Sequence, residues 1–212
     1  MRSYLTVILV ILAALMFGCA DPAANKPKAS VANAAPESNS SQPAAAEKLV
    51  ISPETSKVEF VAAKVTRSHN GSFKQFSGTI DLVPNSIPDS RVTIDIQTNS
   101  VVTDEPDLTK HLQTPDFFDV AKFPKATFVS TKIEPGSGGA THQVTGNFEL
   151  HGVKKSITFP ATIQVTPDSV SVDAEFSINR KDFGVVFQNK TDDLIRDNVV
   201  IKLTIKAPRA KP

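Results

Sequence analysis

The ten residues VSVDAEFSIN, at positions 170–179, decide the fold of this chain. Hydrophobic residues stand at every second position from Val170 to Ile178, and polar or charged residues stand between them. Successive side chains of a strand point to opposite faces of a sheet, so this alternation predicts a strand with one buried and one solvated face. The segment therefore favours an antiparallel sheet that covers a core on one side.

The same period of two recurs through most of the region from Lys57 to Lys206. Clusters of Pro, Gly, Asn and Asp separate the alternating segments, as in PGSGG at 135–139. One short helix is predicted at Pro106–Gln113, between the third and fourth strands, because Pro106 suits a first helical turn. The pattern predicts eight strands, at residues 57–65, 71–83, 91–101, 125–134, 141–151, 153–165, 169–180 and 197–207.

Eight strands with one apolar face favour an all-β fold, an antiparallel up-and-down barrel whose closure removes exposed edges. A two-sheet sandwich would show the same alternation, but long strands with mostly short connections favour the barrel. In an up-and-down order, the connections after the odd-numbered strands share one end. The phenylalanine-rich stretch HLQTPDFFDVAKFPKATF at 111–128 lies in one of them. We predict that this end, with Phe117, Phe118, Phe183 and Phe187, is the mouth of a barrel that can hold one small ligand.

The N-terminus has the features of an export signal. Arg2 precedes an apolar run at 5–17, which is shorter than the roughly 20 residues of a membrane-spanning helix. Cys19, the only cysteine, follows in MFGC, which resembles the acylation site of a bacterial lipoprotein. We predict a signal peptide at 1–18 and a protein that faces the periplasm, held at a membrane of the cell envelope through Cys19. A simple secretory signal and an uncleaved anchor are the alternatives. By the sorting rule of Gram-negative lipoproteins, Ala20 favours the outer membrane.

Residues 19–47 are rich in Ala, Pro, Ser and Asn, and Val31 is their only large apolar residue. Such a segment buries too little apolar surface to offset the entropy of ordering, so we predict a flexible tether. The barrel domain follows at 48–208, with a short tail at 209–212. The chain has 23 basic and 22 acidic residues, and this balance argues against binding to nucleic acid.

Several motifs are similar to those of the YceI-like family. The most specific are PDFFD at 115–119, FP at 123–124 and ATF at 126–128. Further matches are FSGTI at 76–80, LHGVK at 150–154 and NRKDFG at 179–184. The resemblance covers about residues 49–208. It implies a lipocalin-like barrel that binds a polyisoprenoid or a related long amphiphilic lipid, such as an isoprenoid quinone or a prenyl phosphate.

This resemblance implies an apolar chain inside the barrel. Lys64 and Arg180 continue inward-facing rows at the ends of their strands, so they are our candidates for binding a polar head group; solvated charges at strand ends are the alternative. The residues predicted to contact lipid, in the interior and at the mouth, are Phe60, Phe76, Ile80, Ile94, Phe117, Phe118, Phe128, Phe148, Phe159, Phe176 and Phe183.

The sequence has no nucleophile motif, phosphate-binding loop or metal-ligand spacing, so it predicts a binding protein with no catalytic residue, metal or cofactor. A structural or protein-interaction module with a solid core is the main rival, and a hydrolase of lipid esters that uses His111 with Asp119 is a weaker one. An interior cavity of roughly 300 Å3 or more would support the lipid carrier, and a filled interior would support the module. The sequence leaves homodimer formation open.

Overall fold

The computed structural model describes residues 20–36, 46–187 and 194–209. Cys19 and the predicted signal peptide lie outside these residues. Four helical segments occur in the described part of the chain: η1 (Ile87–Asp89), η2 (Thr98–Ser100), α1 (Pro106–Leu112) and η3 (Arg180–Phe183). The strands are β1 (Ser30–Asn33), β2 (Glu47–Ile51), β3 (Lys57–Ala63), β4 (Ser68–Phe73), β5 (Phe76–Leu82), β6 (Arg91–Gln97), β7 (Val101–Thr103), β8 (Lys125–Pro135), β9 (His142–Leu150), β10 (Val153–Val165), β11 (Ser169–Asn179) and β12 (Asn198–Pro208).

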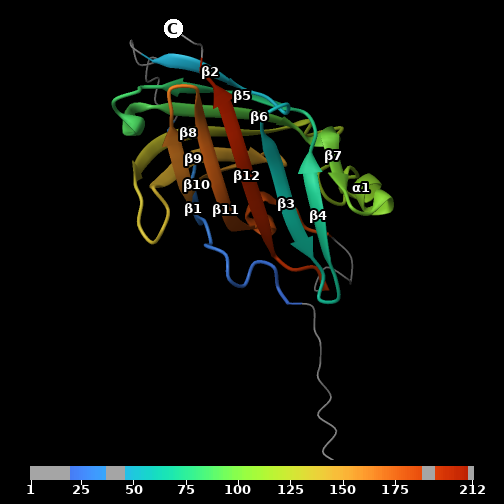
Figure 1. The fold of residues 1–212 in the computed structure, drawn as a ribbon. Coiled ribbons are helices and arrows are strands. Elements are labelled where there is room, and N and C mark those ends of the chain that lie inside the picture. Colours follow the sequence, from blue (N-terminus) through green and yellow to red (C-terminus); the bar gives the residue numbers. More distant parts are fainter. Residues whose placement is uncertain (1–19, 37–45, 188–193, 210–212) are drawn as a thin grey trace, which may run out of the picture.

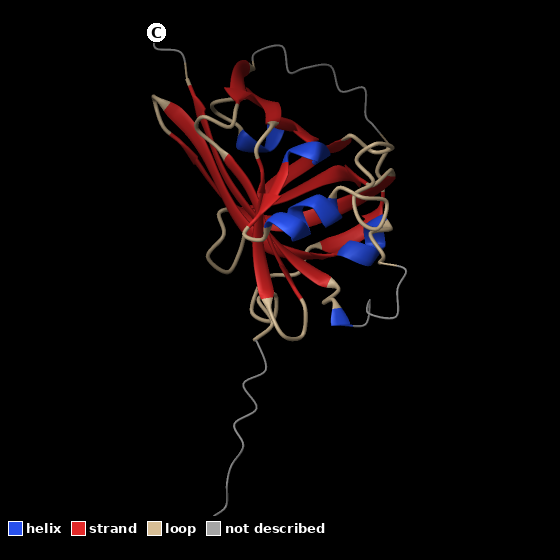
Figure 2. Ribbon diagram, turned by 90° about the vertical axis from the view of Figure 1, so that its right-hand side faces the viewer, coloured by secondary structure: helices blue, strands red, loops and turns tan. Residues whose placement is uncertain are grey.

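The strands form one antiparallel sheet in the order β2-β5-β6-β8-β9-β10-β11-β12-β3-β4-β7, and β1 is added to β10. β4 and β5 lie near opposite ends of this order, yet only Lys74 and Gln75 separate them in the chain. The sheet therefore curls round on itself (Figure 1). Figure 2, in which the side that carries α1 faces the viewer, shows how strongly the strands curve. The all-β, barrel-like architecture agrees with the alternation of the sequence.

The predicted count of eight strands is wrong, because the described residues hold twelve. The second predicted strand is divided into β4 and β5, and the third into β6 and β7. At both breaks the chain turns a corner: the Lys74 amide donates to the Ser100 carbonyl, and the Gln75 amide donates to Ser100 Oγ. A period of two continues across such a corner, so the sequence pattern does not reveal it. β1 and β2 are additional strands.

Residues 20–36, called the N-terminal arm below, were expected to be part of the flexible tether. They instead pack on the barrel, with Ala23 and Ala29 buried. The arm gains order from hydrogen bonds to the sheet rather than from apolar bulk, since β1 pairs with β10 from Ser30–Thr158 to Asn33–Lys155. Composition alone does not predict such pairing.

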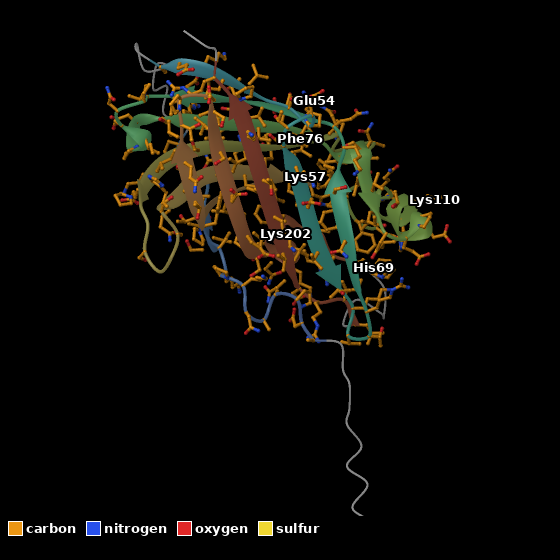
Figure 3. All side chains as sticks on the ribbon, viewed as in Figure 1. Glu54, Lys57, His69, Phe76, Lys110 and Lys202 are labelled. Carbon is orange, nitrogen blue, oxygen red and sulfur yellow. The ribbon has the colours of Figure 1, made fainter. Side chains whose placement is uncertain are left out.

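The core lies inside the curled sheet and consists of the inward-facing residues of the alternating rows. Phe76, labelled in Figure 3, belongs to it and is buried at the start of β5. Two glycines make room for large rings: a side chain at Gly71 would overlap Phe60, and one at Gly146 would overlap Phe128. Ring and glycine therefore form complementary pairs on neighbouring strands.

Candidate functional site

The barrel interior contains a cavity of about 110 Å3. Every residue that lines it is hydrophobic except Glu59. Seven of the predicted lipid-contacting residues line it: Phe60, Ile80, Ile94, Phe128, Phe148, Phe159 and Phe176. The other four, Phe76, Phe117, Phe118 and Phe183, do not line it. The cavity is smaller than the 300 Å3 expected for a ligand of drug size or larger, yet the interior is not solid.

Much of the lining consists of aliphatic residues that the prediction passed over in favour of phenylalanines. The alternation already placed several of them on the inward face, namely Val144, Ile157, Ile163, Val172, Ile178, Ile201, Leu203 and Ile205. Phe73 also lines the cavity and was not predicted. It is out of phase with Phe76 in the sequence, and only the corner between β4 and β5 brings both side chains to the inside.

Phenylalanine rings form a connected series through the interior. Phe159 and Phe176 stack with their centroids 4.2 Å apart and an interplanar angle of 12°. Phe128 packs on Phe159 at 5.7 Å. These rings come from β8, β10 and β11, so the cavity wall joins three strands that the sequence separates.

Two phenylalanines of the predicted mouth pack against rings of the cavity wall, and two others stack on each other. Phe118 contacts Phe73 at a centroid distance of 5.9 Å, and Phe183 contacts Phe148 at 5.1 Å. Phe117 stacks on Phe187 at 5.4 Å. Since Phe183 has no exposed surface and Phe117 is 8% exposed, these rings close this end of the barrel. They act as a plug in this conformation, and the cavity lies beneath them.

Arg180 fixes the loops at the mouth. Its guanidinium donates to the carbonyls of Val185, Arg196 and Ile195 and to the Asp197 carboxylate, at 2.9–3.4 Å. The side chain is buried, but it does not line the cavity. Arg180 was predicted to bind a lipid head group at the mouth. In the structure its guanidinium binds protein groups instead and links the loop after η3 to the start of β12.

Lys64 is solvent-exposed, so its predicted inward orientation is wrong. The alternation changes phase just before it, because Ala63 is buried and Ala62 is only half-buried. Lys64 instead makes an isolated bridge with Ile195 at the barrel rim. The sequence signal for this change was weak, since Val61 and Val65 already disturbed the alternation of the first predicted strand.

Among the described histidines, none lines the cavity. His111 Nε2 lies 2.8 Å from Asp116 Oδ2, so its carboxylate partner is Asp116 and not the predicted Asp119. Asp119 has a φ of 44° and its carbonyl accepts from Lys122 and Phe123, which makes it a turn residue.

Two groups near the barrel ends have displaced pKa values. Burial raises the pKa of Asp104, but hydrogen bonds from His69 and the Asn70 amide outweigh it and leave the pKa below its ordinary value. Figure 3 labels His69 near one end of β4. Burial lowers the pKa of His142. The described residues contain no cluster of three or more side chains suited to a metal ion. They also include no helix that is long and apolar enough to cross a membrane.

The sequence of residues 49–207 matches the model of the YceI-like domain. The chain belongs to the YceI-like family. Protein YceI from Salmonella arizonae is 36% identical over 121 residues, which cover 54% of this chain and 62% of the relative. The match thus spans less than two thirds of that protein.

Several solved structures share the fold. BcnA from Burkholderia cenocepacia superposes with a TM-score of 0.67 and 26% identity, over 74% of this chain and 99% of BcnA. The Campylobacter jejuni YCEI protein gives a TM-score of 0.59 and 28% identity, over 66% of this chain and 85% of that one. A polyisoprenoid binding domain from Saccharophagus degradans gives a TM-score of 0.60 and 17% identity, over 78% of this chain and 99% of that domain. At this identity the similarity shows the fold alone.

Proposed function

We propose that this YceI-like protein binds a polyisoprenoid or a similar long-chain amphiphilic lipid inside its barrel, to sequester or carry it, without catalysis. The observation that carries the proposal is the apolar cavity, because a hydrocarbon is the ligand class that such a lining suits. Burying each CH2 group there is worth about 0.8 kcal/mol, so a few isoprene units can outweigh an association cost of about 4–15 kcal/mol. The name of the Saccharophagus degradans domain points to the same ligand class.

The size of the cavity sets a condition on this proposal. A dry apolar cavity of about 150 Å3 is known to accept benzene, so a volume of about 110 Å3 seats one small hydrocarbon group. A long chain therefore requires the interior to widen. The mouth plug and the inward-facing rings are the elements whose rearrangement would supply that volume.

We also propose that Cys19 is acylated and holds the mouth end of the barrel at a bacterial membrane, with the barrel facing the periplasm. The arm supports this orientation. Asp21, two residues after Cys19, forms an ion pair of 3.5 Å with Arg196, whose carbonyl accepts a hydrogen bond from Arg180 at the mouth. Exposed hydrophobic side chains lie at the same end, namely Val65, Val186 and Leu194. An anchor at Cys19 would bring this apolar rim to the membrane surface.

Lipid binding is tested by extracting lipid from the purified full-length protein and identifying it by mass spectrometry. A Val172→Phe variant fills the cavity from its wall, whereas Val50→Phe adds the same bulk at a side chain that is 62% exposed. We expect the bound lipid to be lost from the first variant and retained in the second. Equal lipid content in wild type and Val172→Phe would contradict binding in the cavity.

The small cavity also favours a second candidate, a structural or protein-interaction module with a nearly solid barrel. In that case the purified protein carries no lipid, and added polyprenyl phosphate does not bind. The same extraction therefore separates the two candidates.

A further inference from the structure

Strands β10 and β11 pair over only part of their length. Four residue pairs join them, from Thr162–Asp173 to Val165–Val170. Beyond these pairs, toward the mouth, residues 153–161 of β10 and 174–179 of β11 make no direct ladder with each other in the described structure. The two strands thus diverge and leave a gap in the barrel wall, called the β10–β11 gap below.

Pro160 explains where this gap begins. The Ile163 amide donates to Thr141, so odd-numbered residues of this part of β10 direct their amides toward the β9 side. Residue 160 therefore faces the β11 side, and as a proline it has no amide hydrogen to donate. The ladder between β10 and β11 ends at this residue, which makes β10 an edge strand from there to the mouth.

The N-terminal arm occupies the gap. On one side β1 pairs with β10 over four residues. On the other side, the Ala29 amide donates to the Ser177 carbonyl at 2.9 Å, and the Ser177 amide donates to the Pro27 carbonyl at 2.8 Å. In Figure 1 the arm runs along the lower ends of β10 and β11. It thus covers part of both free edges, residues 155–158 of β10 and Ser177 of β11.

The lipid cavity lies directly behind the arm. Ile157 on β10, which is the register partner of Val31, lines the cavity, as do Phe176 and Ile178 on β11. At the apex of the gap, Ala161 and Ala174 lie just beyond the last residue pair between β10 and β11, and both are buried. A surface hollow of about 410 Å3 lies over this apex, and its lining includes Pro27, Pro160 and Glu175. Behind this apex, Phe159 of β10 and Phe176 of β11 stack across the start of the gap and form part of the cavity wall. The outer hollow and the inner cavity are therefore separated by the arm, by small side chains and by this pair of rings.

We propose that the β10–β11 gap is the entry site for the lipid and that the N-terminal arm is its removable seal. This inference rests on the proposed function, and it names the route by which lipid reaches the interior cavity. Release of the arm opens the wall beside the cavity, and a long chain can then enter there as the inward-facing rings rearrange to make room for it.

The arm is easier to displace than the mouth plug. At this gap it adds only the buried Ala29 and the half-buried Val31 to the core, and its strand β1 is held by four residue pairs. The plug contains Phe183, which has no exposed surface, and Arg180 clamps its loop through backbone carbonyls. Local opening is favoured where few buried contacts are lost, so the arm opens first.

A reversible disulfide tests this route. Ser30 and Thr158 are register partners, and the spacing of such Cα partners suits a disulfide. The Ser30→Cys/Thr158→Cys protein, full-length and oxidised, is mixed with vesicles that contain a fluorescent polyprenyl phosphate. We expect loading to be slower than in wild type by about tenfold or more, because the arm can no longer open locally. Reduction of the same sample should restore the wild-type rate, which also shows that the variant is folded.

Thr145→Cys/Thr158→Cys is the matched control, because it shares the substitution of Thr158 but ties β10 to β9 and leaves the gap untouched. We expect it to load like wild type. A variant that acts in the opposite direction is Asn147→Ala, since Asn147 exchanges two hydrogen bonds of 2.9 Å with Ala35 and so holds the end of the arm. It should load faster. Loading of the locked protein at the wild-type rate overturns the entry site alone, whereas failure of the wild type to load overturns the proposed function as well.

Discussion

Strand β11 pairs with β12 over eleven residue pairs on one side and with β10 over only four on the other. The first contact, called the continuous ladder here, needs no other element. The second is completed by the N-terminal arm, a segment poor in large apolar residues. On its β12 side, β11 thus borders a continuous part of the barrel wall, and on its β10 side it borders a part that the N-terminal arm completes. The difference indicates that the barrel can open at one place without losing its fold.

The inward face of β11 gives the largest expected effect. Phe176 stacks on Phe159 across the start of the β10–β11 gap and is the register partner of Ile201 across the continuous ladder. We expect Phe176→Ala to lower the free energy of unfolding by about 3–5 kcal/mol, because it removes a buried ring and leaves a larger cavity. Chemical denaturation measures this loss.

Ile201→Ala is the control for Phe176→Ala, because Ile201 also lines the cavity but belongs to β12. It should cost less, about 2–4 kcal/mol, since a smaller side chain is removed. Equal losses would show that the ring stack across the gap adds nothing to the stability of the wall.

The mouth end of the continuous ladder depends on Arg180. Arg180→Ala leaves the carbonyls of Val185, Ile195 and Arg196 without their donor, so we expect a loss of about 2–4 kcal/mol in unfolding free energy. Lys64→Ala, at an exposed strand end, should change the stability by less than about 0.5 kcal/mol. If the two variants melt alike, Arg180 is not the clamp that fixes the mouth loops.

Hydrogen exchange compares the two sides of β11 without any mutation. We expect amides of β1 to exchange at least about 30-fold faster than those of the middle of β12, a difference of about 2 kcal/mol in opening free energy. The reason is that four residue pairs hold β1, whereas β12 pairs with both β11 and β3. Similar protection of β1 and β12 would contradict a removable arm.

The sequence predicted those parts of the molecule in which side-chain alternation reports burial. VSVDAEFSIN became β11, the predicted helix became α1, and seven of the eleven predicted contact residues line the cavity. The corner at Lys74 and Gln75 was missed because a bend leaves the alternation almost unchanged, and with it Phe73 was missed. Lys64 was misplaced because the inward-facing row shifts from Ala62 to Ala63, and two adjacent alanines give no sequence signal for that shift. The arm was missed because backbone hydrogen bonds to free strand edges, which composition does not encode, order it.

The smallest expected effect concerns Glu175, which joins both sides of β11. Its carboxylate binds Lys26 of the arm at 2.7 Å and Lys202 of β12, labelled in Figure 3, at 3.1 Å. The hydrogen bond from Lys26 is the main cause that holds the pKa of Glu175 below its ordinary value of 4.5, with a further contribution from Lys202 and against the effect of burial. A lowered carboxyl pKa stabilises the folded state above pH 4.5, and this stabilisation is lost as the pH falls through the folded-state pKa.

Acidification below pH 4.5 should therefore speed amide exchange in the arm, while β12 stays protected by its two ladders. The effect should stay within about 1 kcal/mol, because the Glu175 side chain is 36% exposed and solvent screens its ion pairs. Glu175→Gln should show fast arm exchange at every pH and remove this pH dependence. Glu149→Gln, which removes a surface ion pair with Lys154 between β9 and β10, should retain it. Arm exchange that does not respond to pH in the wild type would mean that backbone pairing alone holds the arm, and the two sides of β11 would then be independent of Glu175.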